Sequence, residues 1–309
     1  MALNIIFMGT PDFAVPILKS INNSNHNILE VYTQPPNKKD RGQKINSSPI
    51  HQYCDQIKLK VRHPDILDSE EELRHILSLN PDIAVVVAYG KILPPKLLNL
   101  KNILFINIHA SLLPKWRGAA PIHRSIMNLD DETGISIMKI ISKLDAGPIM
   151  QKAKIKIKKK NNFVDLSKKL SKLGSEMILE SLDLIENDKA KFIPQNEKEA
   201  TYAKKINKKE AKINWNDKAR LIIAKINAFN PNPGTWFELY GNRVKVMKAI
   251  EIKEIGKPGL IINKDFTIAC SENAVQILEL QKEGKQKMTA KEFLIGNKLE
   301  VGSNINLDV

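Results

Sequence analysis

Hydrophobic residues in the N-terminal part of the chain form short continuous runs, separated by segments with helical spacing. Continuous runs of Val and Ile are typical of strands buried on both faces, and their alternation with helices is typical of a parallel sheet. The sequence therefore predicts an α/β domain on a mostly parallel sheet, with strands at Asn4–Met8, Val31–Thr33, Ala84–Ala88 and Leu104–Ile108 and a helix at Glu71–Leu79.

The first predicted strand is followed directly by the turn Gly9-Thr10-Pro11-Asp12-Phe13. Thr10 is suited to cap a helix, Pro11 to its first position and Asp12 to its positively polarised end. Gly9 stands alone here, whereas a dinucleotide-binding turn has the pattern Gly-x-Gly-x-x-Gly. We therefore expect no NAD site at this turn, although ligands of open α/β sheets still bind beyond the carboxyl ends of the strands.

Two extended segments, Gly134–Ile141 and Ile149–Ile157, predict a hairpin joined through Lys143-Leu-Asp-Ala-Gly-Pro148. Lysines alternate with apolar residues in the second segment, at Lys152, Lys154, Lys156 and Lys158. This alternation favours an edge strand with a solvated lysine face over a nucleic-acid-binding surface.

The chain has 309 residues, a length that usually divides into about two domains. Apolar spacing predicts helices at Phe163–Glu186 and Ala219–Phe229, and the polar, lysine-rich segment Asn187–Lys209 between them predicts a linker. Short strands separated by Gly and Asn turns are typical of a small β-barrel. The sequence after the second helix predicts such strands at Thr235–Leu239, Arg243–Ala249, Gly259–Ile262, Thr267–Cys270 and Ala274–Leu280.

Charge is the property of the composition that bears most on function. Lys and Arg number 48 against 34 Asp and Glu, which gives a formal net charge of +14. An excess of this sign favours a polyanionic partner such as nucleic acid. Because the lysine excess accompanies abundant Ile and Asn, a bias in genome composition explains it equally well, and charge alone leaves both explanations open.

With 42% apolar and 27% charged residues, the composition is that of a globular protein and excludes the disordered and membrane classes. The N-terminus lacks the basic region and the length of a signal peptide, so we expect a cytoplasmic protein without a membrane partner. Cys54 and Cys270 lie far apart and predict reduced thiols. We expect no metal site, because these histidines form no ligand pattern with acids or cysteines: His51, His63, His75, His109 and His123.

The strand Leu104–Ile108 leads into polar residues that can carry chemistry. Asn107 and His109 are two positions apart, so a strand directs both side chains to the same face. Asp145 lies in the loop of the predicted hairpin, which the sheet can bring to the same end. An amide donor, an imidazole and a carboxylate together can stabilise an oxyanion and move protons. Taken singly, a histidine at a strand end is more often structural and an Asp in Asp-Ala-Gly more often forms a turn, and the pattern alone leaves these alternatives open.

Longer motifs carry a resemblance to a known family. Asn107-Ile-His109, followed by Ser111-Leu-Leu-Pro-Lys-Trp-Arg-Gly118 and by Leu144-Asp-Ala-Gly147, resembles the formyltransferases that use 10-formyltetrahydrofolate. The resemblance covers nearly the whole chain. The branch of the family that acts on tRNA is indicated by further motifs: FMGTPDF at Phe7–Phe13, VYTQP at Val31–Pro35, VVVAYG at Val85–Gly90, GAAPI at Gly118–Ile122, AFNP at Ala228–Pro231 and LQKEGK at Leu280–Lys285.

The resemblance implies both a fold and a reaction. The fold is an α/β, Rossmann-like N-terminal formyltransferase domain with a mostly parallel sheet (residues 1–189), a linker (190–208) and a smaller C-terminal OB-like β-barrel domain that binds tRNA (209–309). The reaction is transfer of the formyl group from the co-substrate 10-formyltetrahydrofolate to the α-amino group of methionine on initiator tRNA, which gives N-formylmethionyl-tRNA for translation initiation. The resemblance implies a monomer that uses no metal.

Roles for individual residues also follow from the resemblance. The expected catalytic set is Asn107, His109 and Asp145, and Arg117 and Gly118 are expected to fix the loop after the catalytic strand. The expected folate-binding residues are Ser111, Leu112, Leu113, Pro114, Ala88, Tyr89, Gly90 and Leu144. By composition the segment Pro35–Lys44 is a solvated surface loop, but the resemblance implies that it contacts the acceptor end of the tRNA through Lys38, Lys39, Arg41 and Lys44.

Three alternatives stay open beside this interpretation. A non-enzymatic RNA-binding protein would use the basic β domain and keep the α/β domain as a scaffold, and the motifs around Asn107 argue against it. A glycinamide ribonucleotide formyltransferase would share the catalytic set but should lack the C-terminal domain. A sugar-nucleotide formyltransferase could retain a similar C-terminal segment. The chain also departs from relatives at Asp40, where a glycine is common, and at Asn232, where a tryptophan is common.

Overall fold

The computed structural model describes residues 2–39, 44–297 and 299–305, and for residues 37–39, 44 and 45 it describes the backbone. The chain folds into two compact units. The first unit contains Met1–Pro121, Thr133–Ile155 and Ser167–Ala203. The second unit contains Ile122–Glu132, Lys156–Leu166 and Lys204–Val309, so it combines the C-terminal third with two shorter segments from the N-terminal part of the chain.

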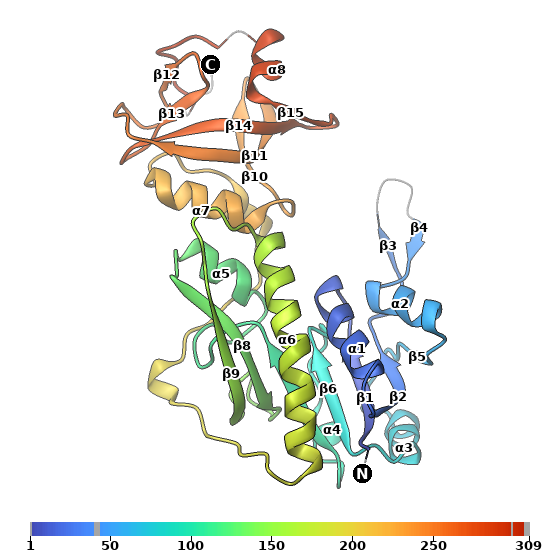
Figure 1. The fold of residues 1–309 in the computed structure, drawn as a ribbon. Coiled ribbons are helices and arrows are strands. Elements are labelled where there is room, and N and C mark those ends of the chain that lie inside the picture. Colours follow the sequence, from blue (N-terminus) through green and yellow to red (C-terminus); the bar gives the residue numbers. More distant parts are fainter. Residues whose placement is uncertain (1, 40–43, 298, 306–309) are drawn as a thin grey trace. The chain divides into compact units, whose positions relative to one another are not determined.

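The first unit is built on a seven-stranded sheet (Figure 1). The pairings from β5 through β7 are parallel, and β8 runs antiparallel to β7. These pairings confirm the predicted α/β fold with a mostly parallel sheet. In spatial order the strands are β5 (Val61–Arg62), β2 (Asn27–Tyr32), β1 (Asn4–Gly9), β6 (Ile83–Val87), β7 (Leu104–His109), β8 (Glu132–Lys139) and β9 (Ile149–Lys156).

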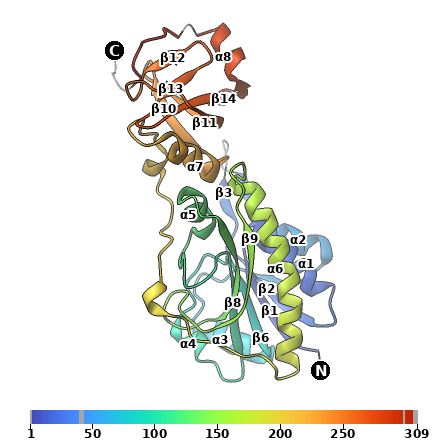
Figure 2. The same cartoon turned by 60° about the vertical axis from the view of Figure 1, so that its left-hand side comes forward.

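Helices lie along both faces of this sheet, and Figures 1 and 2 show the longest of them, α6, running across one face. At Gly174, α6 lies against Ile17 of α1 and Ile108 of β7. On the opposite face, Leu97 of α4 and Phe105 of β7 belong to one apolar cluster. None of the helices in the described part of the chain has the length and apolar character needed to cross a membrane. The helices are η1 (Asp12–Ala14), α1 (Val15–Asn22), α2 (Pro49–Ile57), α3 (Glu70–Ser78), α4 (Pro95–Leu98), α5 (Pro121–Met127), α6 (Phe163–Glu186), η2 (Glu197–Glu199), η3 (Lys208–Ala211), α7 (Ala219–Phe229) and α8 (Ala290–Ile295).

The turn after β1 differs from its prediction. Pro11 occupies the position before the short helix η1, and no side chain caps that helix. The Thr10 hydroxyl instead donates a hydrogen bond to the carbonyl of Tyr89 at 2.8 Å and accepts one from the backbone N–H of Gln34 at 3.3 Å. Thr10 therefore links the carboxyl ends of β1, β2 and β6, because a tertiary partner for its hydroxyl competes with the local cap.

The segment predicted as a basic loop contains a short hairpin. β3 (Asn37–Lys39) pairs antiparallel with β4 (Lys44–Asn46). Strands of three residues are too short to show a period of two in the sequence, so the pattern could not reveal them.

The second unit contains an antiparallel sheet, which confirms the predicted C-terminal β domain. The strand order is β10-β11-β14-β13-β12, and β15 pairs with β14. The prediction omits β15 and α8. The strands are β10 (Thr235–Leu239), β11 (Asn242–Ile252), β12 (Ile261–Asn263), β13 (Thr267–Ala269), β14 (Ala274–Lys282) and β15 (Lys287–Thr289).

A chain of aromatic contacts runs through the core of the second unit. The ring centroids of Trp215 and Phe237 are 5.6 Å apart, those of Phe237 and Phe266 are 6.2 Å apart, and those of Phe266 and Phe293 are 5.5 Å apart. Such pairs contribute about 0.5–1.5 kcal/mol each beyond the burial of their area. Phe293 lies in α8, so this short helix is part of the core and not an appendage.

Candidate active site

Asn107, His109 and Asp145 come together at the carboxyl end of β7. Asn107 and His109 lie on one face of the strand and pair with Met138 and Ser136 of β8. Asn107 Nδ2 donates to Asp145 Oδ1 at 3.3 Å, and His109 Nδ1 lies 3.7 Å from Asp145 Oδ2. The side chains of His109 and Asp145 are 6% and 12% exposed, so their interaction is screened less than that of an open surface pair. The three side chains of the predicted catalytic set therefore form one cluster.

The ring of His109 is oriented by the backbone carbonyl of Trp116. Nε2 lies 2.9 Å from that oxygen, and because a carbonyl only accepts hydrogen bonds, Nε2 carries a proton. Nδ1 faces Asp145 on the other side of the ring. A second proton on the imidazole would therefore lie between His109 Nδ1 and Asp145 Oδ2.

The loop between β8 and β9 carries Asp145 in a left-handed backbone conformation, with φ at +48°. This region is uncommon for residues other than glycine, although Asp visits it more readily than most. The Asp145 carboxylate is held through both oxygens, since Oδ1 accepts from Asn107 and Oδ2 accepts from the backbone N–H of Gly118 at 2.8 Å. Leu144, a predicted folate contact, is 56% exposed beside it.

The predicted folate-binding turn Ala88–Gly90 follows β6 and presents its backbone to solvent. Ala88 and Gly90 are exposed and have φ of +47° and +86°. Tyr89 points into the apolar interior, where burial raises its pKa to about 12. Its carbonyl accepts hydrogen bonds from Thr10 and Gln34. A ligand at this turn would therefore meet Ala88 and Gly90 and not the ring of Tyr89.

The predicted folate-binding segment after β7 is only partly accessible. Ser111 and Leu113 are fully buried, whereas Leu112 and Pro114 are half-buried. The Ser111 hydroxyl donates to a backbone carbonyl four residues later, and the N–H of Leu113 donates to Ser136 Oγ at 3.0 Å. Ser111 and Leu113 thus fix the segment, and a ligand could contact the side chains of Leu112 and Pro114.

Three of the four predicted tRNA contacts lie on the β3–β4 hairpin, which Figure 1 shows projecting beyond the end of the seven-stranded sheet. Lys38 and Lys39 are in β3 and Lys44 begins β4. Lys39 and Lys44 are paired across the hairpin. Arg41 lies outside the described residues.

A hydrogen-bonded network around the buried Arg117 was not predicted from the sequence. The Arg117 side chain is fully buried and forms hydrogen bonds with both carboxylate oxygens of Glu197 and with Oε1 of Gln195. Lys143 also pairs with Glu197, at 2.6 Å. The hydrogen bonds from Arg117 and Lys143 lower the pKa of Glu197 to about 2. Gln195 and Glu197 lie in the segment predicted as a linker, where no periodic pattern marks them.

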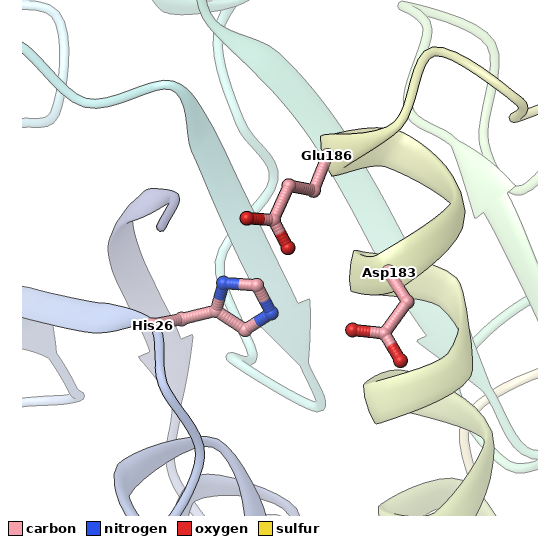
Figure 3. Close-up of side chains that lie close together, drawn as sticks. All are labelled: His26, Asp183 and Glu186. Carbon is pink, nitrogen blue, oxygen red and sulfur yellow. The ribbon is translucent and has the colours of Figure 1, made fainter. Parts of the chain in front are cut away.

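One group of His, Asp and Glu side chains in the described part of the chain has a spacing that could hold a metal ion: His26, Asp183 and Glu186, whose ligand atoms lie within 4.8 Å of one another. Figure 3 shows the His26 ring facing the two carboxylates of α6. His26 Nδ1 accepts a hydrogen bond from the backbone N–H of Leu3 at 3.2 Å, so the neutral ring carries its proton on Nε2. Neither nitrogen then offers a free lone pair, and the group does not fit a metal.

Comparison with solved structures finds chains of similar fold. HypX from Aquifex aeolicus in complex with tetrahydrofolic acid aligns with a TM-score of 0.63 and 17% identity over 95% of this chain and 47% of that chain. The N-formyltransferase from Helicobacter canadensis, in complex with folinic acid and dTDP-3-aminofucose, aligns with a TM-score of 0.67 and 20% identity over 91% of this chain and 100% of that chain.

Sequence comparison gives the family. The sequence model of the family described as formyl transferase matches residues 3–182, and that of the formyl transferase C-terminal domain matches residues 205–298. The chain is 49% identical over 307 residues to the methionyl-tRNA formyltransferase of Pelagibacter ubique (strain HTCC1062), covering 99% of each chain. It is 43% identical over 294 residues to that of Paracoccus denitrificans (strain Pd 1222), covering 95% of this chain and 97% of the relative. The chain therefore belongs to the formyltransferase family and, within it, to the methionyl-tRNA formyltransferases.

Proposed function

We propose that this protein transfers the formyl group of 10-formyltetrahydrofolate to the α-amino group of methionine on initiator tRNA and so gives N-formylmethionyl-tRNA for translation initiation. The observation that carries the proposal is the cluster of Asn107, His109 and Asp145 at the end of β7, in a chain whose relatives over nearly its full length are methionyl-tRNA formyltransferases. An amide donor, an imidazole and a carboxylate can supply the oxyanion stabilisation and the proton transfer that assist acyl transfer to an amine. The cytoplasm is the expected compartment of the reaction.

The roles of the three residues follow from the bonds that change. A bond forms between the amine nitrogen and the formyl carbon, the bond from that carbon to N10 breaks, and the proton lost by the amine is delivered to N10. Asn107 Nδ2 donates one hydrogen to Asp145, and in this proposal its other N–H donates to the formyl oxygen, where negative charge develops. A doubly protonated His109 adds positive charge beside it, and Asp145 holds that charge and relays the amine proton toward N10.

We propose that the residues around the cluster bind the flat pterin ring of the co-substrate. 10-Formyltetrahydrofolate supplies the formyl group together with a pterin ring. The exposed backbone of Ala88 and Gly90 offers hydrogen-bonding groups to the polar edge of such a ring. Leu144, Leu112 and Pro114 offer apolar surface.

For the RNA, we propose that the basic segment Pro35–Lys44 contacts the acceptor end through Lys38, Lys39, Arg41 and Lys44, and that residues 209–309 add basic surface. Support comes from the net charge of +14, because cationic side chains that neutralise phosphates release counterions and strengthen binding. We expect the protein to act as a monomer, which light scattering of the purified protein would test.

The decisive experiment is a formyl-transfer assay with parallel acceptors. Initiator methionyl-tRNA, a nucleotide sugar carrying an amine and glycinamide ribonucleotide are each incubated with the protein and 10-formyltetrahydrofolate. Transfer to the tRNA is the expected result. Transfer only to a small acceptor would overturn the tRNA substrate, and the absence of transfer to every acceptor would overturn the function.

The proposed RNA contact is tested separately with Arg41→Ala. We expect kcat/KM for the aminoacylated tRNA to fall by about tenfold, with the KM for 10-formyltetrahydrofolate within about twofold of wild type, because Arg41 is proposed to contact the RNA and is not among the proposed folate-binding residues. Lys156→Ala, which removes an equal charge from the exposed face of β9, is the matched control and should leave both values unchanged. An equal loss in the two variants would mean that net charge, and not the hairpin, is responsible.

A further inference from the structure

The side-chain amide of Gln195 joins the buried Arg117 to the loop that carries Asp145. Its Oε1 accepts hydrogen bonds from Arg117 Nε at 3.1 Å and from Arg117 Nη2 at 2.8 Å. Its Nε2 donates to the backbone carbonyls of Asp145 at 2.9 Å and of Gly147 at 2.7 Å. An amide side chain has two acceptor sites and two donors. The two bonds from Arg117 and the two bonds to the loop carbonyls therefore use the full hydrogen-bonding capacity of Gln195.

Arg117 determines the orientation of the Gln195 amide. A guanidinium has donors only and stays charged, so the amide oxygen must face Arg117 and the NH₂ group must face the loop. Arg117 is itself fully buried, and its backbone N–H and carbonyl pair with Thr201 and Ala203. The orientation of Gln195 is therefore set by a fixed part of the interior.

Besides Gln195, two backbone hydrogen bonds hold the loop: the N–H of Ala146 donates to the Lys143 carbonyl at 3.3 Å, and the N–H of Lys139 donates to the Pro148 carbonyl at 2.9 Å. The pair between Lys143 and Glu197 has side chains 58% and 52% exposed, and exposed pairs contribute little. The Gln195 bonds act on the carbonyl of Asp145, which is the residue with the positive φ, and on the carbonyl of Gly147, two residues after it. A shift of these carbonyls would turn the carboxylate away from Asn107 and His109.

We propose that Gln195 is a positioning residue for the formyl transfer, which sets the orientation of the Asp145 carboxylate by holding the backbone of its loop. The kinetic part of this inference rests on the proposed function. Gln195 would touch neither the formyl group nor the amine, and its effect on the reaction would pass through Asp145.

Gln195→Glu is the most informative variant. It keeps the size and the acceptor that faces Arg117, but it replaces the NH₂ group with an oxygen that cannot donate to the two loop carbonyls. We expect kcat to fall by at least about tenfold, with the KM values for 10-formyltetrahydrofolate and tRNA within about twofold of wild type, because an effect through the orientation of Asp145 acts on the transition state. Asn196→Ala is the matched control: it removes the neighbouring, exposed amide, which bonds to Glu199 and to the N–H of Lys198 but to neither Arg117 nor the loop, and should leave kcat unchanged.

A double-mutant cycle distinguishes positioning from general damage to the fold. If Gln195 acts through Asp145, Gln195→Glu should lower kcat by less than about twofold in an Asp145→Asn background, because the group that it positions is already disabled. A loss of the same factor in both backgrounds would overturn the proposal, and so would a Gln195→Glu variant with wild-type kcat.

Amide hydrogen exchange of the folded protein provides a test that does not depend on activity. Gln195→Ala should speed exchange in residues 140–148, whereas Asn196→Ala should leave that segment unchanged. Unchanged exchange in Gln195→Ala would overturn the inference. A wild-type protein that formylates no acceptor would overturn the proposed function, and the exchange result would still decide whether Gln195 holds the loop.

Discussion

Gly118 connects the stability of the loop after β7 with the orientation of Asp145, and Gly118→Ala tests both. Gly118 has φ of +116°, and a Cβ added there would lie 2.9 Å from the carbonyl oxygen of Ala203. Its backbone N–H donates to Asp145 Oδ2 at 2.8 Å. An alanine at this position must either keep the strained conformation and the close contact or move the N–H away from the carboxylate.

Both responses lower the free energy of unfolding. A residue other than glycine in a sparsely populated region of this kind costs about 1–3 kcal/mol, and a hydrogen bond to a charged group contributes about 1.5–3 kcal/mol. Alanine also restricts the unfolded chain more than glycine does, which offsets about 0.4–1 kcal/mol of this loss of stability. We therefore expect Gly118→Ala to lower the free energy of unfolding by about 2 kcal/mol. Because about 1.4 kcal/mol corresponds to a factor of ten in rate, a displaced Asp145 should also lower kcat by at least about tenfold.

Urea unfolding and formyl-transfer kinetics together check this prediction. The matched control is Gly241→Ala, where φ is +69° and an added Cβ would meet nothing within 4 Å. The control has the left-handed conformation without the close contact, so its unfolding free energy should change by about 1 kcal/mol or less, and its kcat should not change. If Gly118→Ala unfolds at the same urea concentration as Gly241→Ala and retains wild-type kcat, the reasoning about Gly118 is wrong.

Two further predictions concern ionisable side chains in the interior. Glu72→Gln removes the carboxylate that accepts hydrogen bonds from Tyr32 at 2.6 Å and from Arg62 at 2.7 Å, and it should lower the free energy of unfolding in urea by about 1–3 kcal/mol; an unchanged midpoint would contradict this. Burial, followed by the charge of the next residue, lowers the pKa of His123 from 6.5 to about 4. As the pH falls, the unfolded chain therefore binds a proton before the folded protein does, so stability decreases as the pH drops from 6.5 to 4. His123→Phe keeps an aromatic contact with Phe163 and should make the thermal midpoint less dependent on pH across this range.

The elements that the sequence pattern predicted are those whose environment is uniform along their length. The helix α6 has the predicted bounds, Phe163–Glu186, because an apolar stripe that faces the sheet repeats over many turns. β1, β6 and β7 are buried on both faces and therefore read as continuous apolar runs. The short strands β3 and β15 were missed, since three residues cannot establish a period.

The candidate site was predictable to the extent that it depends on one strand. The spacing of Asn107 and His109 follows from the alternation of side chains along β7, and the approach of Asp145 follows from a hairpin at the edge of the same sheet. Gln195 was not predictable, because its partners are 78 residues away at Arg117 and 50 residues away at Asp145. A contact of this range leaves no local pattern in the sequence.

The geometry of Asp145 shows why such long-range contacts matter for function. Its carboxylate accepts from Asn107, 38 residues before it, and from Gly118, 27 residues before it, while its carbonyl accepts from Gln195, 50 residues after it. A single restraint would leave the loop free to relax toward a negative φ, but three restraints from separate segments determine both the backbone and the side chain. A carboxylate that is fixed before the substrates arrive needs no reorganisation when charge develops beside it, which is the condition for efficient electrostatic stabilisation. The loss of any one restraint should therefore lower kcat even where the protein stays folded, because the remaining contacts keep the loop folded without keeping the carboxylate in place.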